Sequence, residues 1–368
     1  MMIEINFQKL KEVIAMVERA AGKHLSLPIL SCIMVDVGKN ETTFRSTNLE
    51  IGVEVTVPTK NTNIGKFTVP AHILSSFVSQ NHNPNQVVKI ETNSGNLSIT
   101  LQKSKAVIKT LPPDDFPPIP EIINGKEFEI PTNLIIKGFK SVYYSASTSG
   151  VKPELSSVYL YNDNDDLIFA ATDSFRLAEK KIRPSNPIQI DSVLIPFRNS
   201  TDIVQIVDKM GSSLKMNVGK NLISFEGEGV RVVSRIIDGT FPDYRQIIPK
   251  GFVTEVIALK EDIINALKIS NIFADKFSQI KISVNPKKGI FEVQSKNNDV
   301  GENKTTVDGA LSGEPVEATF NYKYIADCFQ SIDADSVSLQ FNGMGKPLVI
   351  RPVSGEQNFL YLAMPMNR

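Results

Sequence analysis

The sequence repeats itself with a period of about 125 residues, and this repeat constrains the fold more than any other feature. Phe116 in DDFPPIP and Phe241 in GTFPDYRQIIP lie 125 positions apart, and Thr47 and Thr172 show the same separation. An unrelated chain would need several independent coincidences to match at one spacing. A chain of 368 residues with this period is therefore expected to hold three copies of one module.

Each copy begins with an amphipathic helix and later runs from a short strand into a second helix. The first helices are predicted at residues 6–20, 131–146 and 259–273. The strand–helix segments are predicted at residues 67–78, 193–207 and 318–329. Alternating runs between them indicate half-buried antiparallel strands. The fold class is α+β, with three tandem similar domains at residues 1–126, 127–250 and 251–368, each with sheet on one side and two helices on the other.

Composition indicates a globular protein without a cofactor. Hydrophobic residues make up 41% and charged residues 22%, and no apolar run approaches the ~18 residues of a membrane span. Cys32 and Cys328 form no CxxC or His/Cys cluster, so no disulfide, metal site or cofactor is predicted, and the cytoplasm is the expected compartment. The 40 basic and 40 acidic residues cancel. A protein that binds DNA by neutralising many phosphates normally has a basic excess, so any DNA binding here must be weak, be local or depend on geometry.

Six segments, in order along the chain, resemble those of the bacterial DNA polymerase III beta subunit family, the DNA sliding clamps. They are SLPIL (26–30), STNLE (46–50), TLPPDDFP (110–117), ATDSFRLA (171–178), RIIDGTFPDYRQIIPK (235–250) and YLAMPM (361–366). The resemblance implies a non-catalytic processivity subunit, with two chains closed head to tail into a ring. It also implies double-stranded DNA, the replicative polymerase and the clamp loader as partners.

Helix counting supports two chains. Six inner helices spaced about 10 Å apart form a circle only about 19 Å across, which is too narrow for a duplex. Twelve helices give about 38 Å between axes and roughly 28 Å clear of helix bulk, which admits double-stranded DNA. A three-module chain that encircles DNA is therefore expected to be a homodimer.

Candidate contacts with DNA are basic residues on the first helices and near helix ends, although helix lysines are often simply solvated. They are Lys9, Lys11, Lys23, His24, Lys137, Lys140, Lys152 and Arg198. The family resemblance implies a basic contact at His24, which would be weaker and pH-dependent as a histidine. It also implies a dimer contact between Ala106 and Ile108 of one chain and Ile272 and Phe273 of the other.

The resemblance further implies an apolar pocket between the second and third domains that binds short peptides of partner proteins. Its residues would be Leu155, Thr172, Ser174, Phe175, Arg176, Leu177, Pro242, Ile247, Leu362, Ala363, Met364, Pro365 and Met366. Methionines adapt to different ligands, which suits a shared site. Without the family, Leu177, Met364 and Met366 would be interpreted as core residues. Phe175 replaces a histidine common in the family and would make one wall more apolar.

Two alternatives to a sliding clamp are a DNA-processing enzyme and a non-enzymatic scaffold unrelated to replication. A DNA-processing enzyme is disfavoured because GxxxxGK[ST], GxSxG and HExxH are absent. The segment 342–346 resembles a phosphate loop, but Pro347 follows it where Ser or Thr is required, so a turn is predicted. Acidic residues such as Asp114 and Asp238 lie in Pro/Gly-rich segments typical of turns. The third class, a scaffold unrelated to replication, has no motif in its favour.

Overall fold

The computed structural model describes residues 1–22, 27–81, 86–93, 95–343, 345–355 and 358–366, so Lys23 and His24 lie outside the described residues. The chain divides into two compact units. Unit 1 comprises Met1–Ile136 and Arg198–Ile236, and unit 2 comprises Lys137–Phe197 and Ile237–Arg368.

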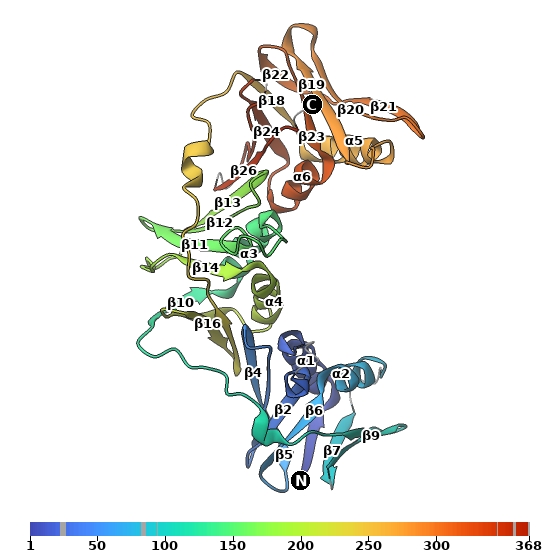
Figure 1. The fold of residues 1–368 in the computed structure, drawn as a ribbon, viewed down its shortest axis with the longest axis vertical. Coiled ribbons are helices and arrows are strands. Elements are labelled where there is room, and N and C mark those ends of the chain that lie inside the picture. Colours follow the sequence, from blue (N-terminus) through green and yellow to red (C-terminus); the bar gives the residue numbers. More distant parts are fainter. Residues whose placement is uncertain (23–26, 82–85, 94, 344, 356–357, 367–368) are drawn as a thin grey trace. The chain divides into compact units, whose positions relative to one another are not determined.

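Unit 1 contains two antiparallel sheets (Figure 1). The five-stranded sheet has the order β5 (Lys60–Asn61), β1 (Met2–Asn6), β7 (Val87–Asn93), β8 (Asn96–Thr100), β9 (Lys105–Lys109). The eight-stranded sheet has the order β10 (Lys126–Pro131), β15 (Ser213–Val218), β16 (Leu222–Gly227), β17 (Val230–Arg235), β4 (Ile51–Pro58), β3 (Glu41–Thr47), β2 (Cys32–Val37), β6 (Gly65–Pro70). Alternate residues of these strands point into the core, as the period of two predicts.

The helices of unit 1 cover these sheets. Helix α1 (Phe7–Val17) begins where the side chain of Asn6 accepts a hydrogen bond from the backbone N–H of Lys9. It buries an apolar face that includes Leu10 and Ile14 and lies beside α2 (Ala71–Ser79), as Figure 1 shows. Helix α4 (Phe197–Val207) follows strand β14 (Val193–Pro196) directly. The predicted helices and strand–helix segments of this part of the chain are confirmed.

Unit 2 has the same kinds of layer. Its nine-stranded sheet has the order β14, β11 (Ser157–Asp163), β12 (Asp166–Thr172), β13 (Arg176–Ile182), β26 (Phe359–Ala363), β25 (Leu348–Pro352), β24 (Ser336–Phe341), β18 (Thr254–Leu259), β22 (Gly309–Gly313). Its four-stranded sheet has the order β21 (Gly301–Thr306), β20 (Ile290–Asn297), β19 (Gln279–Asn285), β23 (Val316–Asn321). Its helical segments include most of α3 (Thr132–Val142), α5 (Lys260–Ile272) and α6 (Tyr322–Ala326).

Helix α3 lies close against its sheet because Gly138 has no side chain. A Cβ atom at Gly138 would meet the ring of Phe169 at 2.4 Å. The neighbouring Phe139 makes an edge-to-face contact with the same ring, with centroids 5.1 Å apart. The glycine therefore allows helix and strand to approach closely.

The three modules share one topology, which confirms the predicted α+β fold with three tandem similar domains. Each module has a sheet built on its first strand and a second sheet built on the strand after the first helix. Sheets of successive modules then join edge to edge. The first junction pairs β4 with β17 inside unit 1, and the second pairs β13 with β26 inside unit 2. The middle module is thereby shared between the two units. The predicted boundaries near residues 126 and 250 stay predictions.

The two units differ in aromatic content. The chain has eight tyrosines and no tryptophan. All eight tyrosines fall in unit 2, whose residue ranges hold Tyr143, Tyr144, Tyr159, Tyr161, Tyr244, Tyr322, Tyr324 and Tyr361.

Candidate functional site

The residues predicted to bind partner peptides lie together in unit 2, around the turn between β12 and β13. The hydroxyl of Thr172 donates to the carbonyl of Arg176 (2.6 Å). One carboxylate oxygen of Asp173 accepts from the backbone N–H groups of Phe175 and Arg176, both at 2.9 Å. These bonds hold Ser174 at φ 78°, and Phe175 is 60% exposed. The turn therefore presents an apolar side chain to solvent.

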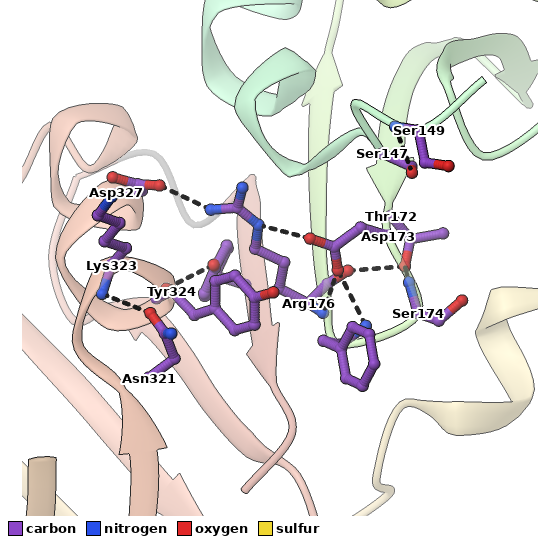
Figure 2. Close-up of polar contacts among 12 residues, drawn as sticks. Ser147, Ser149, Thr172, Asp173, Ser174, Arg176, Asn321, Lys323, Tyr324 and Asp327 are labelled. Carbon is purple, nitrogen blue, oxygen red and sulfur yellow. Dashed lines mark hydrogen bonds and ion pairs between the residues drawn. The ribbon is translucent and has the colours of Figure 1, made fainter. Parts of the chain in front are cut away.

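Arg176 ties this turn to the third module, as Figure 2 shows. Its guanidinium donates to Asp173 (3.0 Å) and to Asp327 (2.6 Å) and lies 4.7 Å from the ring centroid of Tyr324. Burial opposes the positive charge, but the surrounding Tyr361, Asp327 and Asp173 raise the pKa of Arg176 above its ordinary value. Because both carboxylates engage the guanidinium, Arg176 holds the β12–β13 turn of the second module to the start of helix η7 (Asp327–Ser331) in the third.

The ring of Phe175 also stacks on Tyr324, with centroids 6.4 Å apart and planes 22° apart. Tyr324 belongs to α6, whose first turn is capped by Asn321 through the backbone N–H of Lys323 (2.9 Å; Figure 2). The sequence analysis missed Tyr324 and Asp327. Tyr324 lies in the middle of α6 and Asp327 directly follows that helix, and no sequence motif singles out either residue.

The chain end forms the next part of the site. The backbone N–H of Met364 donates to the carbonyl of Phe175 (2.8 Å), and that of Met366 donates to the carbonyl of Thr319 (2.7 Å). Between these two bonds Met364, Pro365 and Met366 are half-buried. The tail is therefore held in an extended form beside the turn.

Buried apolar side chains lie under this surface. Leu177 and Leu362 are almost fully buried and belong to one cluster with Phe241 and Tyr244, against which Met364 packs. Leu155, Thr172 and Ala363 are buried as well. Pro242 and Ile247 are exposed at either end of a short 3-10 helix, η5 (Tyr244–Ile247). The candidate peptide site is accordingly a buried floor with an exposed or half-exposed apolar rim, and this rim consists of Phe175, Pro242, Ile247, Met364, Pro365 and Met366.

The candidate DNA contacts occupy separate positions in the two units. Lys9 and Arg198 are exposed in unit 1, and Lys11 is half-buried. Lys140 and Lys152 are exposed in unit 2, and Lys137 is half-buried. Lys9 and Lys11 belong to α1, Lys137 and Lys140 to α3, and Arg198 to α4, whereas Lys152 lies in the loop before β11.

Two of the candidate dimer residues lie on an edge strand, and the other two lie at the end of a helix. Ala106 and Ile108 are on β9, which pairs with β8 alone among the described strands. Ile272 is 66% exposed at the end of α5. Phe273 follows it, and its ring lies 3.9 Å from the position that a Cβ atom would take on Gly301 of β21. Strand β21 pairs with β20 alone in the described part of the chain.

A cavity of about 540 Å³ lies elsewhere, on the four-stranded sheet. Two of its lysines are paired, Lys281 with Glu317 (2.6 Å) and Lys304 with Glu292 (2.9 Å). We therefore interpret this face as a solvated surface. The described residues contain no cluster that could hold a metal ion and no helix long and apolar enough to cross a membrane. The segment predicted as a turn carries a hydrogen bond from the N–H of Lys346 to the carbonyl of Gly343 (3.3 Å).

Comparison with known proteins decides the family. Residues 1–120, 129–243 and 245–367 match the N-terminal, central and C-terminal domains of the DNA polymerase III beta subunit. The chain belongs to the DNA polymerase III beta subunit family. Its function is that of a sliding clamp, the non-catalytic processivity subunit of the polymerase, which confirms the resemblance seen in the sequence.

Individual relatives of this family match nearly the whole chain. The beta sliding clamp of Synechococcus elongatus is 25% identical over 360 residues, which is 96% of each chain. That of Staphylococcus epidermidis is 24% identical over 344 residues, 91% of each chain. Among solved structures, the beta subunit of Thermotoga maritima superposes with a TM-score of 0.93 at 24% identity over 100% of both chains. The Bacillus subtilis clamp gives 0.91 at 23% identity, over 100% of this chain and 99% of that one.

Proposed function

We propose that two copies of this chain close into a ring around duplex DNA in the cytoplasm. In this ring, the candidate peptide site tethers the replicative polymerase, the clamp loader and other partners that carry a short clamp-binding motif. The observation that carries the ring is the repeated sheet junction. The chain makes this junction twice and leaves free the two strands that would make it a third time.

The repeat identifies these two strands. In module order, β9 is equivalent to β17 and β26, and β21 is equivalent to β4 and β13. Since β17 pairs with β4 and β26 pairs with β13, the missing junction is β9 with β21. Both strands are edges among the described strands, and unpaired edges invite pairing with another chain. A head-to-tail pair of chains would satisfy both edges and leave no free end.

The two existing junctions also define the register of the third. Ile51 lies opposite Ser234 in the first, and Arg176 lies opposite Ala363 in the second. The strand pairings within each module make Ile108 equivalent to Ser234 and Ala363. They make Gly301 equivalent to Ile51 and Arg176. The same register therefore places Ile108 opposite Gly301 of the partner copy. Two residues along, it places Ala106 opposite Asn303.

The side chains at these positions face the same way in both strands. Ala106 pairs with Ile99, whose side chain is buried, so it faces the core side of its sheet. Asn303 accepts a hydrogen bond from Ser270 of α5 (3.3 Å), so it also faces the helix side. This agreement supports the register. It also supports the predicted contact of Ala106 and Ile108 with the end of α5, where Ile272 and Phe273 lie.

A helix contact accompanies each junction. In the first, the side-chain amide of Asn199 on α4 donates to the carbonyl of Glu50 (3.2 Å). In the second, the equivalent Tyr324 stacks on Phe175, which is equivalent to Glu50. The equivalent pair across the third junction would be Ile73 of α2 and Val300 of the partner copy. These side chains are 51% and 59% exposed, and contact between the copies would bury apolar surface on both.

For DNA, the supporting features are the exposed lysines on α1 and α3 together with the zero net charge. A closed ring retains a duplex by topology, so its lining needs only weak phosphate contacts that permit sliding. The salt dependence of retention should accordingly be small for a ring that stays closed.

The ring is tested by retention on DNA of two shapes. After loading onto nicked circular DNA, the protein should stay bound, and linearising that DNA should release it from the ends. Equal retention on circular and linear forms would rule out encirclement. Light scattering of the free protein should give the mass of two chains.

The register is tested by cross-linking. In the first junction Val53 and Val232 occupy the positions of Asn303 and Ala106, and the N–H of Arg235 donates to the carbonyl of Glu50 (2.9 Å). Hydrogen-bonded pairs alternate along an antiparallel ladder, so the Val53–Val232 position is a non-hydrogen-bonded pair, where side chains approach most closely. The variant A106C/N303C should therefore form covalent dimers on oxidation. A106C/K304C, one residue out of register, is the matched control, and cross-linking of the control alone would contradict the register.

A further inference from the structure

A connected series of side-chain hydrogen bonds, called the hydrogen-bond chain below, lies in unit 2 beside the candidate peptide site. Arg245 donates to the hydroxyl of Tyr161 (3.0 Å) and to Asp163 (2.7 Å). The hydroxyls of Tyr161 and Tyr244 are 2.7 Å apart, and that of Tyr244 donates to Glu179 (2.5 Å). The chain thus connects strand β11, helix η5 and strand β13.

The chemistry of the groups assigns a direction to every bond. The hydroxyl of Tyr244 donates its one proton to Glu179. Tyr244 therefore accepts from Tyr161, and Tyr161 in turn accepts from Arg245, which can only donate. Burial raises the pKa of both tyrosines, so each keeps its proton at neutral pH. Hydrogen bonds aligned in this way, from a cation to a carboxylate, polarise and strengthen one another.

Stacked rings support the same group. Tyr159 stacks between Tyr161, with centroids 4.6 Å apart, and Phe241, with centroids 4.7 Å apart. Arg245 lies 5.6 Å from the ring centroid of Tyr161. Tyr244 and Glu179 are only 4% and 7% exposed, so the bonds between them are shielded from competing water.

Both ends of this chain bear on the candidate peptide site. Tyr244 opens η5, and its backbone N–H donates to the carbonyl of Pro242 (2.7 Å). Pro242 and Ile247, at the two ends of this segment, are rim residues. Glu179 is two residues along β13 from Leu177, on the same face of the strand and next to the floor of the site. Moving Tyr244 would therefore move one wall of the site relative to its floor.

We propose that Tyr244 and Glu179 are positioning residues of the peptide site, which hold the Pro242–Ile247 wall in a preformed position through this hydrogen-bond chain. The inference rests on the proposed function of the site. A wall ordered in advance lowers the entropy that a peptide must lose on binding. The equivalent position in unit 1 is Ile119, which has no hydroxyl. It lies in the linker that joins the first module to the second, between β9 and β10. This linker is held instead by Arg231, which donates to the carbonyl of Pro120 (2.8 Å). The tyrosine–carboxylate chain thus accompanies the candidate site and not the fold in general.

Three tyrosine-to-phenylalanine variants of the full-length dimer test this role. The probe is a fluorescein-labelled peptide that carries the clamp-binding motif of the host's replicative polymerase. Y244F and Y161F each break the chain and should weaken peptide binding about 5- to 20-fold, as expected for loss of bonds worth about 1–2 kcal/mol. Y159F is the matched control, because the Tyr159 hydroxyl makes no hydrogen bond to any described residue, and its affinity should stay within about twofold of wild type.

Two further comparisons separate positioning from general stability. E179Q keeps an acceptor for the Tyr244 hydroxyl and should retain most of the affinity, whereas E179L should lose as much as Y244F. The double variant Y161F/Y244F should bind the peptide no more weakly than Y244F, because both variants interrupt the same series of hydrogen bonds. Affinities of Y244F and Y161F equal to that of Y159F would overturn the positioning role. Absence of binding by the wild-type protein would instead overturn the peptide site itself.

Discussion

The two sheet junctions within the chain have the same backbone but opposite surfaces. At each, a threonine closes a turn onto the carbonyl four residues later, Thr47 in unit 1 and Thr172 in unit 2. At each, an N–H of the following module donates to the carbonyl of an equivalent residue, from Arg235 to Glu50 (2.9 Å) and from Met364 to Phe175 (2.8 Å). The geometry of the first junction is therefore repeated in the second.

The side chains differ at three equivalent positions of the two junctions. Glu50 and Arg235 in unit 1 correspond to Phe175 and Met364 in unit 2. Gly52 corresponds to Leu177, and the linker residue Ile119 lies so close that a Cβ atom on Gly52 would meet it at 2.9 Å.

The equivalent carboxylates also have different partners. Glu54 in unit 1 is held by Arg45 (2.6 Å) and Arg231 (2.7 Å), whereas Glu179 in unit 2 accepts from Tyr244. One junction is charged and covered by its own linker, and the other is apolar and open at its rim. The same backbone scaffold thus occurs twice, and its side-chain chemistry suits the proposed peptide docking at one copy only.

Removing the tail should have the largest effect on this difference. Deleting residues 364–368 takes away three rim residues, so peptide binding should fall below detection in a fluorescence-anisotropy titration. The dimer should persist, because β9 and β21 are untouched. Loss of the dimer in light scattering would mean that the tail is structural.

Exchanging side chains between the junctions sharpens the comparison. F175E/M364R gives the open junction the charges of the closed one and should weaken peptide binding at least ~100-fold, since two apolar contacts each contribute about 1.5–3 kcal/mol. The reciprocal variant E50F/R235M should gain no peptide binding, because Ile119 still covers the floor. Binding by the reciprocal variant would show that the rim alone makes a site.

Alanine should destabilise both floors, but for opposite steric reasons and to different extents. Leu177→Ala leaves a cavity and should lower the free energy of unfolding by about 2–5 kcal/mol. Gly52→Ala crowds Ile119 and should lower it by about 1 kcal/mol, since overpacking offsets the lower chain entropy of alanine. Urea denaturation measures both. A more stable Gly52→Ala protein would show that the linker can shift away from the strand.

Alkaline pH should affect unit 2 selectively. Burial raises the pKa of Tyr144, Tyr161, Tyr244, Tyr324 and Tyr361, so folding favours their protonated forms. Their contribution to stability is complete below the unfolded-state pKa of about 10 and is lost as pH rises above it. Tyrosinate absorbance of these groups should therefore appear together with loss of circular dichroism. Ionisation of all eight tyrosines in a protein that keeps its dichroism would contradict this.

The smallest effect is expected at the two turns. Leu49 and Ser174 occupy equivalent left-handed positions, with φ of 74° and 78°. Glycine at either position relieves a cost of about 1–2 kcal/mol but adds chain entropy to the unfolded state. Leu49→Gly and Ser174→Gly should each raise stability by roughly 0.5 kcal/mol. Thermal unfolding of the two variants should show similar shifts, and opposite shifts would mean that the turns are not equivalent.

The sequence predicted the fold well because the helix periodicity is a local signal and the repeat shows the same pattern three times. All six helical segments and the α+β class follow from residue patterns, and the structure confirms them. Side-chain partners across modules could not be predicted in the same way. Nothing near Arg176 in the sequence points to Asp327 or Tyr324, and nothing near Tyr244 points to Glu179, since these contacts depend on strand register. The floor and rim of the site came from family resemblance, and burial then separated Leu177 from Phe175.

Because all tyrosines lie in unit 2, the intrinsic fluorescence of the protein reports on that unit. Without tryptophan, its ultraviolet emission arises from tyrosines in unit 2 alone. Tyr324 and Tyr244 flank the candidate peptide site, so an unlabelled peptide that lacks aromatic residues should change this emission as it docks. Unfolding of unit 1 would leave the emission largely unchanged while the circular dichroism falls. Tyrosine fluorescence can thus follow unit 2 separately from unit 1 without an attached label.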